Sequence, residues 1–242
     1  MVLTEKQQYQ ESGYELPYHW MLDPATKTGR LYFGYWNAII SRIPKGAKSG
    51  RVADAGCGDG RVLGLLGDAG FSNITGIDYS ERALSFVKEI LPDVHLVKAD
   101  LSNIPLPDNS FEAIICVETL EHIFPDQLPA VIKELSRLLV PGGTFIVSVP
   151  SVGMGPPKGA HYQHFSVEVL TKYLAESFKV ESIVGQDRAG FHPLKLLYFV
   201  IDNAWWDLRM LRHWYNLRIW PRYFNVCHPE KGRRLIAGCL KT

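Results

Sequence analysis

Short apolar runs alternate with amphipathic stretches from residue 51 to residue 149, and this alternation predicts the core of the fold. In the amphipathic stretches the apolar residues recur at three- and four-residue spacing, as in a helix with one buried face. The expected strands are 51–55, 74–78, 94–100, 111–118 and 144–149, and the expected helices are 61–69, 80–91 and 126–139. Continuous apolar strands separated by amphipathic helices are typical of a parallel sheet with helices on both faces. Since such crossovers are right-handed, the pattern predicts a doubly wound α/β fold.

An aromatic segment interrupts this alternation between two further expected strands, 178–184 and 234–241. Residues 191–224 hold ten aromatic side chains, from Phe191 to Phe224, together with five lysines and arginines. Part of the segment shows a helical stripe, made by Tyr198, Ile201, Trp205, Leu208, Tyr215 and Ile219. Before it, residues 150–159 hold three glycines and three prolines, which predicts a mobile loop. We therefore expect four parts: an N-terminal aromatic cap (1–49), a core (50–190), an insertion (191–225) and a final core strand (226–242).

Composition and charge narrow the class of protein. Apolar residues make up 46% and charged residues 21% of the 242, as is ordinary for a globular domain. The 26 lysines and arginines against 25 acidic residues leave a formal charge of +1, which argues against binding nucleic acid through many phosphates. No uninterrupted apolar run approaches the ~20 residues of a transmembrane helix, and the polar N-terminus does not resemble a secretory signal. The four cysteines form no CxxC pair, so we expect a cytoplasmic location.

A glycine-rich turn between the first strand and the first helix is the clearest functional signal. It reads VADAGCGDGRVL over residues 52–63. Glycines let a ligand approach the backbone closely, and the following helix N-terminus offers free N–H groups. A nucleotide-like ligand is therefore expected at this turn. A dinucleotide fingerprint would need a glycine where Arg61 stands, which disfavours a nicotinamide-dependent dehydrogenase, and the Gly-Lys-Ser/Thr of a phosphate loop is missing.

Acidic residues end the next two strands at the same edge of the predicted sheet. Asp78 ends the second strand, where a carboxylate can accept both hydroxyls of a ribose. Asp100 ends the third strand, where its carboxylate could accept from an adenine amino group. Each acid alone could be a helix cap or a solvated strand end. Together with the glycine turn, they indicate a nucleoside site along this edge.

Five motifs follow one another along the chain: DAGCGDG, GIDYS, KADLSNIPLPDNSFE, VETLEHI and LLVPGGTFIVSVP. In this order and spacing they resemble the class I S-adenosylmethionine-dependent methyltransferases, over residues 50–185. The resemblance implies a Rossmann-like sheet of seven strands, mostly parallel, with the last strand antiparallel. It also implies a set of cofactor-binding residues. The methionine part of S-adenosylmethionine would contact Asp54, Gly56, Gly58 and Gly60. The ribose would contact Asp78, and the adenine would contact Asp100 and Leu101. Cys57, Tyr79 and Glu118 complete the implied set.

Candidates for proton transfer or metal binding follow the fourth and fifth strands. Glu121 and His122 lie three and four residues beyond Glu118, so on a helical turn the three side chains would share one side. His161 and His164, in GAHYQHFS, follow the glycine- and proline-rich loop and should face the same edge. The catalytic candidates are therefore His122, His161, His164 and Glu121.

The ExxEH pattern with a later histidine is similar to that of two subgroups of the family. One subgroup comprises the metal-dependent 2′-O-methyltransferases of small-RNA 3′ ends. The other comprises the ubiquinone-biosynthesis O-methyltransferases, which the chain resembles more. By that analogy Glu118, Glu121, His122 and His161 could hold a divalent cation such as Mg²⁺ or Mn²⁺. The alternative without a metal is that Glu121 and His122 cap a helix or line the acceptor pocket.

The two aromatic segments outside the core each leave alternatives open. The N-terminal segment could fold over the donor, with Tyr18, His19 and Arg30 as pocket candidates, or only pack against the outer helices. The insertion could be a lid over a hydrophobic acceptor, a peripheral membrane contact, a homodimer contact or ordinary core packing. Nucleic-acid binding is disfavoured there, because Asp202 and Asp207 oppose the arginines.

We therefore expect methyl transfer from S-adenosylmethionine to a small or lipid-like acceptor. Such a transfer is an in-line displacement, so the protein mainly places donor and acceptor correctly. Oxygen is the expected acceptor atom only because base candidates, His122 and His161, are present, and nitrogen and carbon stay open. The alternatives are a metal-dependent RNA 2′-O-methyltransferase and a protein that binds S-adenosylmethionine without catalysis.

Overall fold

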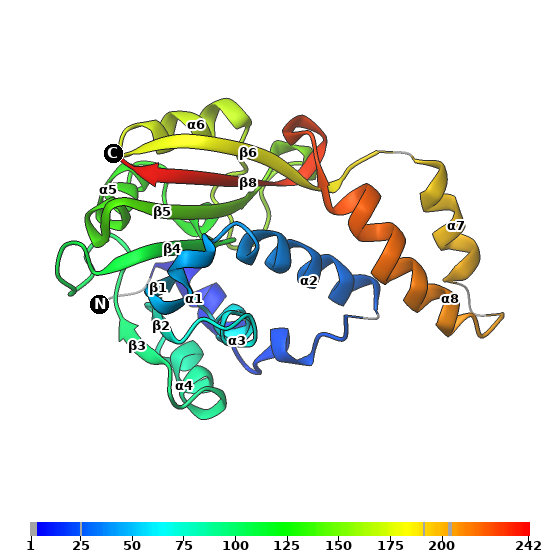
Figure 1. Ribbon diagram of the computed structural model, residues 1–242, viewed down its shortest axis with the longest axis horizontal. Coiled ribbons are helices and arrows are strands. Elements are labelled where there is room, and N and C mark those ends of the chain that lie inside the picture. The colour runs from blue at the N-terminus through cyan, green and yellow to red at the C-terminus, as the bar shows by residue number, and fades with distance from the viewer. Residues whose placement is uncertain (1–3, 25, 191, 203–204) are drawn as a thin grey trace.

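The fold is built on one central sheet, whose strands lie one above another in Figure 1, from β6 and β8 at the top to β3 at the bottom. The computed structural model describes residues 4–24, 26–190, 192–202 and 205–242. The described strands are β1 (Arg51–Ala55), β2 (Asn73–Asp78), β3 (His95–Lys98), β4 (Phe111–Val117), β5 (Leu139–Pro150), β6 (Phe178–Arg188), β7 (Val226–Cys227) and β8 (Gly232–Lys241). Their order across the sheet is β3-β2-β1-β4-β5-β8-β6-β7. The first five strands pair in parallel, whereas β8 runs antiparallel to both of its neighbours, β5 and β6.

Helices cover both faces of this sheet, which confirms the doubly wound α/β fold. The described α-helices are α1 (Glu5–Ser12), α2 (Lys27–Ile40), α3 (Arg61–Asp68), α4 (Glu81–Ile90), α5 (Leu128–Leu138), α6 (Val167–Ala175), α7 (Pro193–Ile201) and α8 (Arg209–Trp214). Successive strand residues point to opposite faces: Val52 packs in the core with α2, α3 and α4, and Ala53 in the core with α5 and α6. Because β1 is buried on both faces, it reads as an apolar run without alternation.

Three details of the sheet differ from the prediction. Eight strands form it among the described residues instead of seven, because the two-residue β7 pairs with β6 at the edge. A strand this short shows no hydrophobic period, so the sequence pattern carries no sign of it. Strand β5 begins at Leu139, directly after α5 and well before the expected residue 144. At the other edge β3 ends at Lys98, so Asp100 lies two residues beyond its strand.

The insertion does not form the single helical stripe that its spacing predicts. Helix α7 ends at Ile201 and α8 begins at Arg209, and Trp205 between them is 90% exposed. Helical turns at Tyr215–Ile219 and Pro221–Asn225 then continue the chain. Its buried cluster consists of Tyr198, Ile201, Tyr215, Trp220 and Phe224. Phe191, the first aromatic residue of the insertion, lies outside the described residues, as do residues 1–3 of the expected cap.

No helix in the described part of the chain has both the length and the apolar character needed to cross a bilayer.

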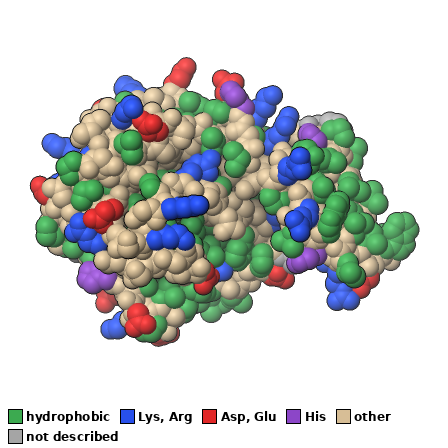
Figure 2. Space-filling view, viewed as in Figure 1, with side chains coloured by type: hydrophobic (Ala, Val, Ile, Leu, Met, Phe, Trp, Pro, Cys, Tyr) green, Lys and Arg blue, Asp and Glu red, His purple; other side chains and the backbone are tan. Residues whose placement is uncertain are grey.

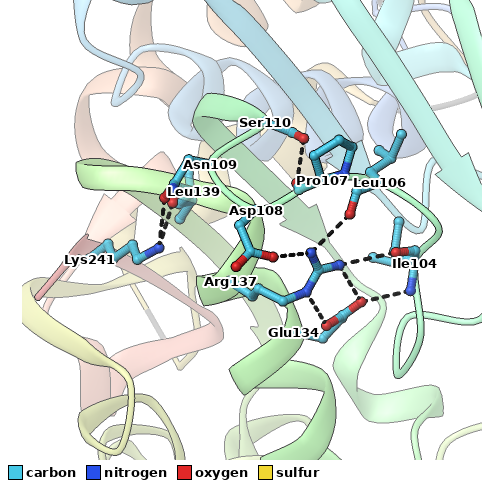
Figure 3. Close-up of polar contacts among 10 residues, drawn as sticks. All are labelled: Ile104, Leu106, Pro107, Asp108, Asn109, Ser110, Glu134, Arg137, Leu139 and Lys241. Carbon is cyan, nitrogen blue, oxygen red and sulfur yellow. Dashed lines mark hydrogen bonds and ion pairs between the residues drawn. The ribbon is translucent and has the colours of Figure 1, made fainter.

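The loop that follows Asp100 is held in place by Arg137 on α5 (Figure 3). The Arg137 guanidinium donates to the carbonyl oxygens of Ile104 and Leu106 at 3.1 and 2.9 Å. It also donates to carboxylate oxygens of Glu134 at 2.8 Å and of Asp108 at 2.6 Å. Glu134 in turn accepts from the backbone N–H of Ile104 at 2.7 Å. One side chain therefore ties the β3–β4 connection to the helix beneath it.

We expect Arg137→Ala to lower the free energy of unfolding by about 1–3 kcal/mol, because charge-assisted hydrogen bonds to two carbonyls and two carboxylates are lost together. Urea denaturation followed by circular dichroism measures the change. Lys133→Ala, at an exposed position of the same helix, is the matched control and should leave the unfolding midpoint unchanged. Equal unfolding midpoints for Arg137→Ala and the unmodified chain would contradict this role.

Candidate active site

A cavity of about 430 Å³ lies where β1, β2 and β4 reach their carboxyl ends. Twelve of the predicted site residues line it: Asp54, Gly56, Cys57, Gly58, Asp78, Tyr79, Asp100, Leu101, Glu118, Glu121, His122 and His161. Gly60 and His164 are not among its lining residues; Gly60 caps α3, and His164 contacts His161 from behind. Of the N-terminal candidates, Tyr18 and His19 line the cavity, whereas Arg30 is buried against the insertion.

The glycine turn is held in a conformation that side chains would disrupt. Gly56 has a φ of 82°, and a Cβ there would lie 2.4 Å from the side chain of Thr119, which follows β4. The N–H of Gly56 donates to the carbonyl oxygen of Ile77 at 2.7 Å, which ties the turn to β2. The N–H of Gly58 donates to Oδ2 of Asp78 at 2.9 Å. The turn and the end of β2 are thus one rigid unit.

Two buried carboxyl groups lie beside this turn. Asp78 uses both of its oxygens locally, because Oδ1 accepts from the N–H of Ser80 at 2.9 Å while Oδ2 accepts from Gly58. Asp54 is 1% exposed, and its Oδ1 has no hydrogen-bond partner. Burial, and after it the charge of Asp78, raises the pKa of Asp54 to about 8. A buried acceptor without a donor fits a ligand that brings a donor or a positive charge.

The raised pKa of Asp54 makes the stability of the ligand-free protein depend on pH. Between about 3.8, the ordinary value, and about 8, the folded state holds a proton that the unfolded state has released. The free energy of unfolding therefore falls as pH rises through this window. We expect Asp54→Asn to weaken that fall and to raise the Tm at pH 8 by several degrees, on the order of 2–4 °C for each kcal/mol.

Thermal melts of the ligand-free protein between pH 5 and pH 9 measure this effect. Asp68→Asn, at an exposed position near the end of α3, is the control and should melt like the unmodified chain at every pH. A parallel decline of Tm in the Asp54→Asn variant and the unmodified chain would show that Asp54 is not the group responsible.

Glu118 takes a different position from the predicted one. It has a φ of 50° directly after β4, and the helical turn begins only at Leu120. Its Oε2 accepts from Nε of Arg234 on β8 at 2.8 Å, and the Arg234 guanidinium lies 4.7 Å from the ring centroid of Tyr35. The expectation that Glu118 shares a helical side with Glu121 and His122 is therefore wrong. The left-handed backbone conformation at Glu118 directs its side chain toward Arg234 instead.

Glu121, His122 and His161 do come together. One potential ligand atom of each lies within 4.8 Å of the other two. Glu121 is 1% exposed and its Oε2 has no hydrogen-bond partner; burial, and then the charge of Glu118, raises the pKa of this carboxyl well above its usual range. Burial also lowers the pKa of His122 to about 4, with a contribution from His161. The cluster is therefore compact, and it joins a buried carboxyl group to two half-buried imidazoles.

A chain of hydrogen bonds assigns the tautomer of His161. Nδ1 of His164 lies 2.6 Å from the carbonyl oxygen of Gly155, which can only accept, so this nitrogen carries the hydrogen. In neutral His164 the other nitrogen, Nε2, is then an acceptor, and Nδ1 of His161 donates to it over 3.1 Å. Burial, and then His164, lowers the pKa of His161 and favours its neutral form. Neutral His161 therefore keeps an unprotonated Nε2, able to take a proton or bind a metal.

Two further residues shape the cavity and were missed in the sequence reasoning. Asp59 accepts from the backbone N–H of His19 at 3.0 Å and contacts its Nδ1 at the same distance, while its carbonyl accepts from Trp20 at 2.8 Å. Through these hydrogen bonds Asp59 links the N-terminal segment to the glycine turn. Arg234 is the other; it is one of two adjacent arginines at the start of β8, so the sequence does not distinguish it from Arg233. Aromatic walls complete the cavity, from Tyr14, Tyr18, Tyr32, Tyr35 and Trp36.

Known proteins resemble this chain in sequence. A family model described as a methyltransferase domain matches residues 53–147. A probable S-adenosylmethionine-dependent methyltransferase of Mycolicibacterium smegmatis is 31% identical over 169 residues, 67% of this chain and 65% of that protein. The demethylmenaquinone methyltransferase of Staphylococcus aureus is 32% identical over 182 residues, 70% of this chain and 73% of that protein. The match thus spans just under two thirds of the M. smegmatis relative's length.

Solved structures support the fold. The crystal structure of an S-adenosylmethionine-dependent methyltransferase from Thermotoga maritima, described as a possible histamine N-methyltransferase, superimposes with a TM-score of 0.61 at 20% identity. The superposition covers 87% of this chain and 89% of that one. At this level of identity the likeness concerns the fold alone.

Proposed function

Because this chain belongs to the class I S-adenosylmethionine-dependent methyltransferase family, we propose that it transfers a methyl group to a small, lipid-like acceptor. One observation carries the proposal: the same cavity is lined at one part by the glycine turn with its acids and at another by His122 and His161. A donor and an acceptor can therefore meet inside it. Holding the two in line is the main contribution of a protein to such a transfer.

The donor end of the cavity fits S-adenosylmethionine. When bound, this cofactor supplies a methyl group on a positively charged sulfur. Asp54 offers a buried oxygen without a partner, and Asp78 can accept from ribose hydroxyls with its remaining lone pairs. Asp100 lines the same cavity and could accept from an adenine amino group. The tyrosine and tryptophan faces of the cavity suit a sulfonium cation.

The acceptor end supports an oxygen acceptor on an apolar, flat molecule. The unprotonated Nε2 of His161 can take the proton from an acceptor hydroxyl as its oxygen forms the bond to the methyl carbon. Aromatic walls of Tyr32, Tyr35 and Trp36 suit a ring compound, which can stack on them or pack edge to face. The name of the S. aureus relative, which specifies demethylmenaquinone, supports a lipid-like ring compound as acceptor and does not specify the atom that receives the methyl group.

The test is calorimetric titration with S-adenosylhomocysteine, followed by transfer of labelled methyl from S-adenosylmethionine to a phenol and a quinol. We expect binding in the micromolar range and label in at least one of the two acceptors. Binding without transfer to either acceptor would favour the non-catalytic alternative. Label in an RNA 3′ end but in neither ring compound would favour the RNA 2′-O-methyltransferase.

We further propose that Glu121, His122 and His161 can hold a divalent cation, because their ligand atoms converge and Oε2 of Glu121 lacks a partner. His164 would then orient His161 through its hydrogen bond. We expect chelation to reduce turnover at least tenfold and added Mg²⁺ or Mn²⁺ to restore it, with S-adenosylhomocysteine affinity unchanged. Full activity in excess chelator would contradict the proposed cation site and would leave His161 as the candidate base.

A further inference from the structure

The segment between β6 and β7 forms a separate lobe that projects beyond the end of the sheet (Figure 1). We call residues 193–225 the α7–α8 lobe; within it, residues 203–204 lie outside the described part. Helix α7 and the helical turns after α8 share a small core, which includes Tyr198, Tyr215 and Phe224. Only the inner sides of the helices are used by this core, so their outer sides are turned away from the rest of the molecule.

The outer surface of the lobe is strongly apolar. Eleven of the 21 large hydrophobic side chains that are exposed among the described residues belong to this lobe. They include Phe199 at 74%, Met210 at 89% and Trp205 at 90% exposure. Figure 2 shows hydrophobic side chains gathered over the lobe with lysines and arginines among them. So large an apolar surface on a protruding part marks a place of contact with a partner.

The net charge of the lobe indicates which kind of partner this apolar surface would bind. It contains five lysines and arginines but two acidic residues, a formal charge of +3 in a chain whose total is +1. Asp207 pairs with Arg209 at 2.7 Å and Asp202 with Arg212 at 3.2 Å. Arg218 and Arg222 are exposed, and no carboxylate of the described residues forms an ion pair with them. The partner is therefore expected to be apolar and negatively charged.

We propose that the α7–α8 lobe docks on an anionic lipid surface. Exposed tryptophan, leucine, phenylalanine and methionine side chains would enter the apolar edge of the bilayer while the arginines contact phosphate groups, as in helices that lie in the interface plane. A second copy of the chain fits less well, because a symmetric contact would bring two +3 surfaces together. Nucleic acid also fits less well, since six of the eleven exposed side chains, Leu196 and Met210 among them, are not aromatic and offer no stacking face.

The lobe is joined to the wall of the cavity through α2. The Arg30 guanidinium lies between the rings of Tyr198 and Trp220, 4.3 and 3.9 Å from their centroids. The Asn225 side chain donates to the carbonyl oxygen of Gly34 at 3.1 Å. The same helix carries residues that line the cavity. Docking would thus place the acceptor end of the cavity near the bilayer. This consequence rests on the proposed function, whereas the docking itself is independent of it.

Sedimentation of the full chain with lipid vesicles tests the proposal. One set contains phosphatidylcholine alone, and in the other part of it is replaced by phosphatidylglycerol. We expect binding to the anionic vesicles, weakened by salt, and about a tenfold lower affinity for Phe199→Ser/Met210→Ser because apolar area is lost. Arg218→Ser/Arg222→Ser should lose the preference for phosphatidylglycerol. Val169→Ser, which removes an exposed apolar side chain on α6, is the control and should bind like the unmodified chain.

Three results would overturn the proposal. The first is that the unmodified chain sediments with neither vesicle, and the second is that Phe199→Ser/Met210→Ser binds as the unmodified chain does. The third is a dimer by light scattering that Phe199→Ser/Met210→Ser abolishes, which would assign the surface to a second copy. Circular dichroism of each variant shows whether it is folded, and S-adenosylhomocysteine titration of the unmodified chain separates failure of docking from failure of the proposed function.

Discussion

Asp78→Asn is expected to raise the Kd for S-adenosylhomocysteine by about 10- to 100-fold, the effect of losing a hydrogen bond to a charged group. Both oxygens of Asp78 accept from backbone N–H groups, of Gly58 on one side and Ser80 on the other. An asparagine must turn its NH₂ group toward one of these donors in either orientation. The glycine turn then loses its link to the end of β2, and the charged acceptor for the ribose is lost as well.

Calorimetry measures this Kd, and circular dichroism shows whether the variant is folded. The Asp93→Asn control removes one carboxylate at an exposed position and should leave the Kd unchanged. Unchanged affinity in a folded Asp78→Asn variant would place the donor elsewhere and would contradict the assignment of the glycine turn.

His161→Gln is expected to lower turnover by about 10²- to 10⁴-fold with little change in donor affinity, the range typical of a lost general base. Glutamine can keep a hydrogen bond to His164 but has no nitrogen that takes up a proton near neutral pH. His164→Ala should have a smaller effect and should alter the pH profile of kcat/KM, because it releases the tautomer that the Gly155 carbonyl selects. The readout is methyl transfer at saturating donor.

His95→Gln, at an exposed position on β3, is the control for the histidine substitutions and should be fully active. Wild-type turnover in His161→Gln together with loss in His122→Gln would move the base to His122. Loss of donor affinity in His161→Gln would mean that the residue supports the cavity as a whole.

The parts predicted well are those in which neighbouring residues act together. Strand β1 has the expected bounds, and the glycine turn leads directly into α3 at Arg61. Asp54, Asp78 and Asp100 meet at one edge because parallel strands end on the same side. The hydrophobic period and the turn residues that specify these elements lie within a few residues of one another.

The errors lie where the backbone departs from a regular element. Glu118, Glu121 and His122 have helical spacing, but the positive φ of Glu118 breaks the turn before it starts. Similarly, the stripe in the insertion is interrupted after Ile201, so Trp205 is exposed instead of buried. Spacing predicts a shared face only if the helix is continuous.

By itself the sequence determined the layered sheet, the family and the acidic, glycine-rich edge of the cavity, since these depend on local patterns. Only the tertiary structure decided the partners of the polar side chains across that cavity. Glu118 and Arg234 are 116 residues apart, and Asp59 is 40 residues from His19. Contacts at such separations depend on how the strands and the N-terminal segment pack. A single sequence has no periodic signal for them, because each is made by one pair of residues and not by a repeated pattern.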